Sequence, residues 1–171
     1  MAFGVSGNCT LQPATFYIET SVWGSLAPQQ PRDRKQVVLR LLRLLDGVRG
    51  VCVVSQAVLA ELEAAPPVKV KPIRKQMQAI KVDVLPITAE VDELAQAYID
   101  AGVLPQRRET DAAHVAVATC FQLDYLVSWN HRHMTRPMKK LQFESVNRVH
   151  GFLKTPLICN PFEACDDLQD R

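Results

Sequence analysis

The fold of this chain is indicated most clearly by one stretch, Asp111-Ala-Ala-His114-Val-Ala-Val-Ala-Thr-Cys120-Phe-Gln-Leu-Asp-Tyr125-Leu-Val-Ser-Trp-Asn130. Its first half is an almost wholly apolar helical pattern with one acid at its start, and a short hydrophobic strand pattern follows. Helix and strand patterns of this kind are typical of an α/β protein. Polar groups at the start of the helix and after the strand are then expected at one edge of the sheet, where ligands bind.

Strand and helix patterns alternate along the rest of the chain. Strands are expected at 16–19, 51–55, 82–87 and 125–129, with an edge strand at 157–159. Helices are expected at 31–48, 56–65, 71–80, 89–101 and 111–122, with Ser55, Thr88 and Thr110 as N-caps and Pro66-Pro67 as the stop of the second helix. This alternation predicts a three-layer α/β/α sandwich with a mainly parallel central sheet.

The length of 171 residues suits one domain better than two. Residues 1–15 are expected to form a flexible leader, 16–162 the folded domain, and 163–171 a frayed acidic tail. No apolar run approaches the roughly 20 residues needed to cross a bilayer, so no membrane association is expected. The first 15 residues do not resemble a secretory signal, and the five cysteines form no CxxC pair, which favours a reducing cytoplasm.

The charge is unevenly distributed along the chain. Residues 31–81 hold eleven Lys/Arg against four Asp/Glu, residues 82–111 hold two against seven, and residues 131–154 hold six against one. Two basic segments flanking an acidic one would suit a phosphate-binding rim around a metal site. Solvated helix faces of alternating sign explain the same pattern equally well.

Four oxygen-bearing side chains follow the strand pattern in order. Glu19 ends the first strand, Asp111 begins a helix and Asn130 follows the fourth strand, while Glu61 lies on the helix after the second strand. Carboxylate and carbonyl oxygens are the ligands that Mg²⁺ and Mn²⁺ prefer. Taken singly, each side chain also fits a turn, a helix surface or a first helical turn. Their order along the β-α pattern makes a cation site the stronger hypothesis.

Sequence motifs of other catalytic classes do not occur. The chain contains no GxSxG, HExxH, P-loop or GxGxxG. A bound divalent ion lowers the pKa of water and neutralises charge on a phosphodiester. Metal-dependent hydrolysis of a phosphodiester would therefore need no protein nucleophile.

Four segments resemble the successive motifs of PIN-domain proteins, most closely the VapC-like toxin ribonucleases. They are Tyr17-Ile-Glu19-Thr-Ser-Val-Trp-Gly24, Val58-Leu-Ala-Glu61-Leu-Glu63, Asp111-Ala-Ala-His114-Val-Ala and Leu126-Val-Ser-Trp-Asn130. The resemblance covers about residues 16–162. It implies an α/β/α domain in which clustered acids and Mg²⁺ or Mn²⁺ hydrolyse RNA, and it implies a small antitoxin protein as partner. A homodimer is also compatible with it.

The resemblance implies a role for each acid. Glu19 stands where the family usually has its first aspartate, Glu61 matches the second acid with Glu63 as the alternative register, and Asp111 matches the third. Asn130 lies where many members carry a further aspartate, so one negative charge is missing. We expect Glu19, Asp111 and Glu61 to be metal ligands and Asn130 to orient water.

Substrate contacts are predicted from neighbouring residues. Arg107 and Arg108 precede Asp111 and are candidates for phosphate contacts, although an exposed loop is as good an explanation. His114 would face the metal or a phosphate, but a packed histidine bonded within the core is the interpretation that we favour. Trp129 fits the buried core, and Trp23 fits base stacking or a protein interface.

These observations predict a metal-dependent ribonuclease, the toxin of a toxin–antitoxin pair. The alternative is a catalytically weak or silent RNA- or protein-binding module on the same scaffold, favoured by Glu19 and Asn130. A different Mg²⁺-dependent phosphohydrolase is a third hypothesis, and the absence of a DxD motif after the first strand counts against it.

Overall fold

The computed structural model describes residues 13–46, 51–130, 134 and 136–170. The strands are β1 (Phe16–Ile18), β2 (Cys52–Ser55), β3 (Asp83–Leu85), β4 (Tyr125–Val127) and β5 (Leu157–Cys159). The helices are α1 (Thr20–Gly24), α2 (Arg32–Leu45), α3 (Gln56–Glu63), α4 (Pro67–Ile80), α5 (Ala89–Asp100), the 3₁₀ turn η1 (Gln106–Arg108), α6 (Glu109–Cys120), α8 (Pro137–Val149) and α9 (Pro161–Gln169).

The five strands form one parallel sheet in the order β3-β2-β1-β4-β5. From β1 the chain moves through β2 to β3 at one edge, then returns to place β4 on the other side of β1. The strand order therefore reverses between β1 and β4. In open parallel sheets, such a reversal leaves a crevice beyond the carboxyl ends of the two strands, and ligands bind there.

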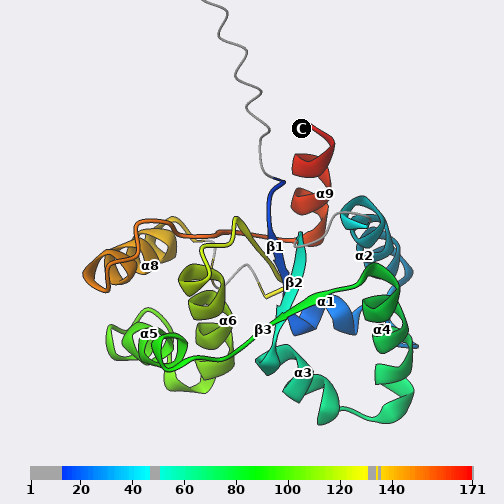
Figure 1. The fold of residues 1–171 in the computed structure, drawn as a ribbon, viewed down its shortest axis with the longest axis horizontal. Helices are drawn as coiled ribbons and strands as arrows, with labels where there is room; N and C mark the ends of the chain where they lie inside the picture. Colours follow the sequence, from blue (N-terminus) through cyan, green and yellow to red (C-terminus); the bar gives the residue numbers. More distant parts are fainter. Residues whose placement is uncertain (1–12, 47–50, 131–133, 135, 171) are drawn as a thin grey trace, which may run out of the picture.

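Helices cover both faces of the sheet (Figure 1). Helices α2, α4 and α9 lie on one side, and α5, α6 and α8 lie on the other. Right-handed crossovers account for the sides of the helices that connect strands, because connections that run in opposite directions across a sheet pass over opposite faces. The predicted three-layer α/β/α sandwich with a parallel sheet is confirmed.

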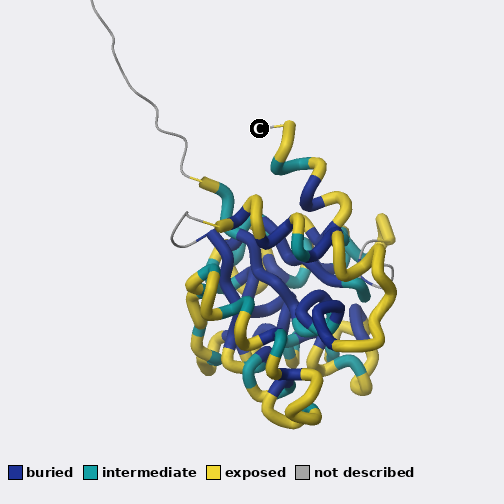
Figure 2. Tube along the Cα trace, turned by 90° about the vertical axis from the view of Figure 1, so that its right-hand side faces the viewer, coloured by how far each residue is buried: buried dark blue, intermediate teal, exposed yellow. Residues whose placement is uncertain are grey.

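The central strands are buried on both faces. Every residue of β1, β2 and β4 is buried, and these strands form the dark core of Figure 2. The edge strand β3 is more exposed, in keeping with its single strand neighbour. None of the helices in the described ranges is long and apolar enough to span a bilayer.

Several helix boundaries differ from their predictions, and two of the differences concern the expected start and stop signals. Pro66-Pro67 was expected only to stop α3, but Pro67 is also the first residue of α4. At that position proline's fixed φ and missing N–H do not disturb a helix. Thr110 is not an N-cap, since α6 begins one residue earlier at Glu109. Thr88 does cap α5, and its hydroxyl accepts a hydrogen bond from Val91 N at 3.3 Å.

The predicted frayed tail is wrong for residues 163–169, which belong to α9. Asn160 and Glu163 form a reciprocal capping box around Pro161, and Ala164 and Cys165 are buried. Most of the predicted leader, residues 1–12, lies outside the described residues. Its last residue, Thr15, is bonded to the Asp124 carboxylate through both its N–H, at 2.8 Å, and its hydroxyl, at 3.0 Å.

Candidate active site

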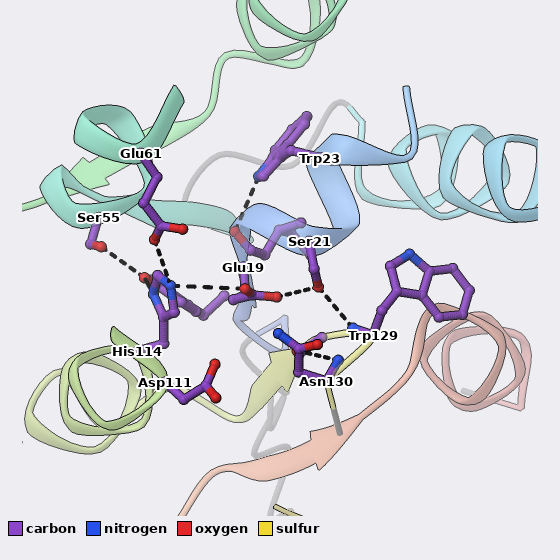
Figure 3. A network of polar contacts seen from close by, with 12 residues as sticks. Glu19, Ser21, Trp23, Ser55, Glu61, Asp111, His114, Trp129 and Asn130 are labelled. Atoms are coloured by element: carbon purple, nitrogen blue, oxygen red, sulfur yellow. Dashed lines mark hydrogen bonds and ion pairs between the residues drawn. The ribbon is translucent and has the colours of Figure 1, made fainter. Parts of the chain in front are cut away.

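Side chains from four segments meet near the carboxyl ends of β1 and β4. Glu19 directly follows β1, Asn130 lies just past β4, Glu61 lies on α3 after β2, and Asp111 lies in the first turn of α6. Figure 3 shows Asp111 and Asn130 on the side of Glu19 that faces away from Glu61. The structure thus brings the four predicted residues into one region, at the reversal of strand order.

Glu19 is a buried carboxylate at a helix start. It is the N-cap residue of α1 and only 4% exposed, and its backbone N–H donates to Val127 O of β4 at 3.1 Å. The Ser21 hydroxyl donates to Oε2 of Glu19, and the same hydroxyl accepts from Trp129 N at 3.0 Å. Ser21 therefore ties the Glu19 side chain to the residues that follow β4.

A buried chain of polar groups leads from β2 to Glu61. Nε2 of His114 lies 3.0 Å from Oε1 of Glu61 and 3.9 Å from Oε1 of Glu19, while its Nδ1 lies 2.7 Å from the Tyr17 hydroxyl. That hydroxyl lies 2.7 Å from Oγ of Ser55. A carboxylate can only accept, so the hydrogen bond between His114 and Glu61 requires a proton on Nε2.

The remaining protons follow from that assignment. Nδ1 of His114 must then accept from Tyr17, and Tyr17 in turn accepts from Ser55. Burial raises the pKa of Tyr17 far above its ordinary value, despite the Ser55 hydrogen bond, and the nearby Glu19 and Glu61 charges raise it further. Tyr17 therefore keeps its proton and can donate it to Nδ1 of His114, which favours the tautomer with the ring proton on Nε2.

His114 serves Glu61 and not a phosphate. Its ring is 1% exposed, and both nitrogens are engaged by protein groups. The interpretation of a packed histidine bonded within the core agrees with this geometry, and the predicted substrate contact does not. Of the two acids on α3 that were considered, Glu61 contacts His114, whereas Glu63 is exposed at the end of the helix.

Asp111 is held by an arginine. Its carboxylate is 10% exposed, and Oδ2 accepts from the Arg108 guanidinium at 2.9 Å. The residue lies in the first turn of α6, where the helix dipole favours negative charge. Arg108 thus neutralises the third acid, while Arg107 is exposed.

The two tryptophans reverse their predicted roles. Trp23 is fully buried and donates its indole N–H to Ile18 O at 3.1 Å, so it supports β1 from within the core. Trp129 is only partly buried, donates to Oγ of Ser25 at 2.7 Å, and lies under the guanidinium of Arg34, 4.8 Å from the ring centre. The sequence pattern missed this because a tryptophan after an apolar strand is usually core.

The donor set suits a hard cation chemically, since it offers three carboxylates and an amide oxygen. Nevertheless, no three or more His, Cys, Asp and Glu side chains among the described residues are grouped so that they could hold a metal ion. Each acid is instead satisfied by a protein donor, namely Ser21 on Glu19, His114 on Glu61 and Arg108 on Asp111. Arg108 engages only Oδ2 of Asp111, so Oδ1 stays available to a cation.

Comparison with known proteins adds no family assignment. No protein-family model matches the chain, and no curated protein matches its sequence. The resemblance to PIN domains therefore stays a prediction that rests on the four motifs.

Several residues of the site were not predicted. Tyr17 and Ser55 lie in the strands expected at 16–19 and 51–55, where Ser55 is also an expected N-cap, and the sequence assigns no role to Ser21. Their polar ends matter only because distant segments meet: Tyr17 and His114 are 97 positions apart. A hydroxyl two positions after Glu19 was the one local signal available.

Proposed function

We propose that this chain is a metal-dependent ribonuclease of the PIN-domain type, which hydrolyses phosphodiester bonds with Mg²⁺ or Mn²⁺. One observation carries the proposal: three carboxylates and an asparagine from four separate segments gather where the strand order reverses. That placement matches the expected position of a ligand site, and acids left there need a cationic or hydrogen-bonded partner.

Each of the four residues would have its own role at the ion. Glu19 and Asp111 would hold the ion, Glu61 would contact it directly or through water, and Asn130 would orient water. When bound, such an ion lowers the pKa of water and neutralises charge on the phosphodiester. His114 keeps Oε1 of Glu61 engaged, at 3.0 Å. This leaves Oε2 of the half-exposed Glu61 without a protein partner in the described residues and able to accept a hydrogen bond from water.

Cleavage of labelled single-stranded RNA in Mg²⁺, Mn²⁺ or EDTA tests the proposal. We expect the wild type to cut only with metal and Asp111→Asn to cut at least a hundredfold more slowly, because the mutation removes a ligand charge. Asp166→Asn, which neutralises an exposed acid on α9, is the matched control and should cut like the wild type. Nitrophenyl phosphate, included as a small ester, should not be hydrolysed.

Calorimetric titration with Mn²⁺ separates the outcomes. The nuclease proposal would be refuted if the wild type and Asp111→Asn were equally inert and neither bound Mn²⁺. Hydrolysis of the small ester with no cutting of RNA would favour the phosphohydrolase hypothesis instead.

The second candidate function is a catalytically silent RNA- or protein-binding module. The observation that favours it is the satisfied state of the acids, with no metal-holding group among the described residues. RNA binding that is equal in EDTA and Mn²⁺, with no product after prolonged incubation, would support this alternative.

We further propose that the ribonuclease acts in the cytoplasm as the toxin of a toxin–antitoxin pair. An apolar groove of about 910 Å³ runs along α3 and α4 and supports a protein partner. Its lining includes the apolar Leu62 and Val70, and three cations, Lys71, Arg74 and Lys75, against one acid, Glu63. This combination fits an amphipathic acidic segment of a small antitoxin.

Co-expression with the product of an adjacent small reading frame tests the partner. We expect a stable complex that Arg74→Glu weakens at least tenfold. Lys69→Glu, on the same helix but outside the groove, should not weaken it. A groove variant that binds the product like the wild type would exclude this groove. Sedimentation of the chain alone would show whether a homodimer occupies the groove instead.

A further inference from the structure

A small cavity lies next to the candidate active site, between the segment that precedes α6 and the first turn of α8. Its volume is about 200 Å³, and its wall includes residues 103–105. Four cationic side chains complete the lining: Arg107, Arg108, Arg136 and Lys139. No acidic side chain is among the described residues that line it.

The positive charge around this cavity is only partly balanced. Arg108 is paired with Asp111, and the Lys139 ammonium donates to the carbonyl oxygen of Val103 in the cavity wall. Arg107 and Arg136 are exposed, and their guanidinium groups form no ion pair with a side chain in the described residues. Like charges gathered around a small space repel one another, so an anion that enters it is stabilised by all four.

The start of α8 adds to the same potential. Arg136 is its N-cap residue without a side-chain cap, Pro137 is its first residue, and Lys139 lies in its first turn. The N-terminal end of a helix carries a partial positive charge and binds phosphate groups. Guanidinium groups add paired donors that match phosphate oxygens.

We propose that this cavity binds a backbone phosphate of single-stranded RNA next to the bond that is cut. The inference rests on the proposed ribonuclease function and names its substrate contact. A cavity of 200 Å³ is smaller than the roughly 300–1,000 Å³ that encloses a whole small ligand, and it suits a single phosphate group.

Arg108 connects the cavity with the acids. It lines the cavity and also binds Asp111, and its side chain is 34% exposed, so it can turn from one to the other. A phosphate in the cavity gives the guanidinium a second partner and frees the Asp111 carboxylate. Contacts to phosphate carry no sequence information, so the cavity sets the register of the strand and does not read its bases.

Binding of a fluorescently labelled single-stranded oligoribonucleotide in EDTA tests the site without turnover. We expect Arg107→Gln/Arg136→Gln to bind roughly five- to tenfold more weakly at low salt. The slope of log affinity against log salt should fall by about 0.7 for the lost phosphate contact. Neither guanidinium is paired with a side chain in the described part of the chain, so the double variant should fold normally; its urea midpoint checks this.

Arg148→Gln is the matched control. Arg148 is an exposed arginine in the last turn of α8, roughly 18 Å along the helix from Arg136, and its loss should change neither affinity nor slope. A double variant indistinguishable from Arg148→Gln would overturn the proposal, and so would a wild type that binds no RNA in EDTA.

The same variants separate this inference from the nuclease proposal. If the wild type cuts RNA with metal and the double variant has an unchanged KM, the phosphate site is wrong while the nuclease stands. If no RNA is cut but the double variant binds more weakly in EDTA, the phosphate site stands and the nuclease does not.

Discussion

Replacing Tyr17 by phenylalanine should damage both the stability and the activity of the protein. The hydroxyl is fully buried and links Oγ of Ser55 to Nδ1 of His114, each at 2.7 Å. Phenylalanine keeps the ring in place, so no large cavity forms. The variant loses two hydrogen bonds of about 1 kcal/mol each and leaves a buried ring nitrogen unpaired, which adds about 1–2 kcal/mol. We therefore expect a loss of about 3 kcal/mol in the free energy of unfolding.

Activity should fall for a separate reason. Without the Tyr17 donor, His114 is free to place its proton on Nδ1, and an unprotonated Nε2 would then face the Glu61 carboxylate. Partners that orient metal ligands typically contribute about ten- to a hundredfold in activity. We expect RNA cleavage in Mn²⁺ to fall by a factor in this range.

Ser55→Ala is the control within the same network. The mutation removes the hydroxyl at the end of the hydrogen-bonded chain but leaves the bond from Tyr17 to His114. Ser55 makes no side-chain cap that the mutation would break. Urea unfolding should show a loss of about 1 kcal/mol with an unchanged m-value, and cleavage should remain near that of the wild type. The assigned proton positions would be refuted if Ser55→Ala and Tyr17→Phe lost equal free energy of unfolding. A urea midpoint of Tyr17→Phe within error of the wild type would refute them too.

Three further predictions concern other parts of the fold. Burial tends to raise the pKa of Asp124, but its bonds with Lys154 and Thr15 outweigh this and lower it. Asp124 therefore stabilises the fold above the ordinary aspartate pKa of about 3.9, and the contribution disappears as pH falls through the lowered native value. Asp124→Asn should cost roughly 1 kcal/mol at most at pH 7, since the pair is partly solvated, and a difference from wild type that persists at pH 2 would contradict this. Asn160→Ala should destabilise the protein by about 1 kcal/mol and speed hydrogen exchange in α9, because it removes the capping box; unchanged exchange would contradict the cap. Burial raises the pKa of Cys52 to about 12, so iodoacetamide at pH 8 should label this residue in urea but not in the native protein, as mass spectrometry can determine.

The strands were the most predictable elements. The runs that form β1, β2 and β4 are short and almost wholly apolar, as strands covered on both faces must be. The predicted strands extended one residue past β1, to Glu19, and two residues past β4, to Trp129.

The missed helix α9 has a local explanation. Its acidic composition suggested a solvated tail, yet Asn160-Pro161-Phe162-Glu163 is a helix-start signal in its own right. Burial of Ala164 and Cys165 in the core then stabilises the helix, a contribution that composition alone does not reveal.

The sequence by itself determined the class of fold and the candidate acids, because hydrophobic period and the order of polar residues are local properties of the chain. Only the tertiary structure decided that β4 lies beside β1 and that His114 serves Glu61. It also brought the start of α8 beside the turn before Asp111, where four cations line one cavity. These arrangements depend on contacts between segments far apart in sequence, and local patterns carry no information about which distant partner a buried polar group will find.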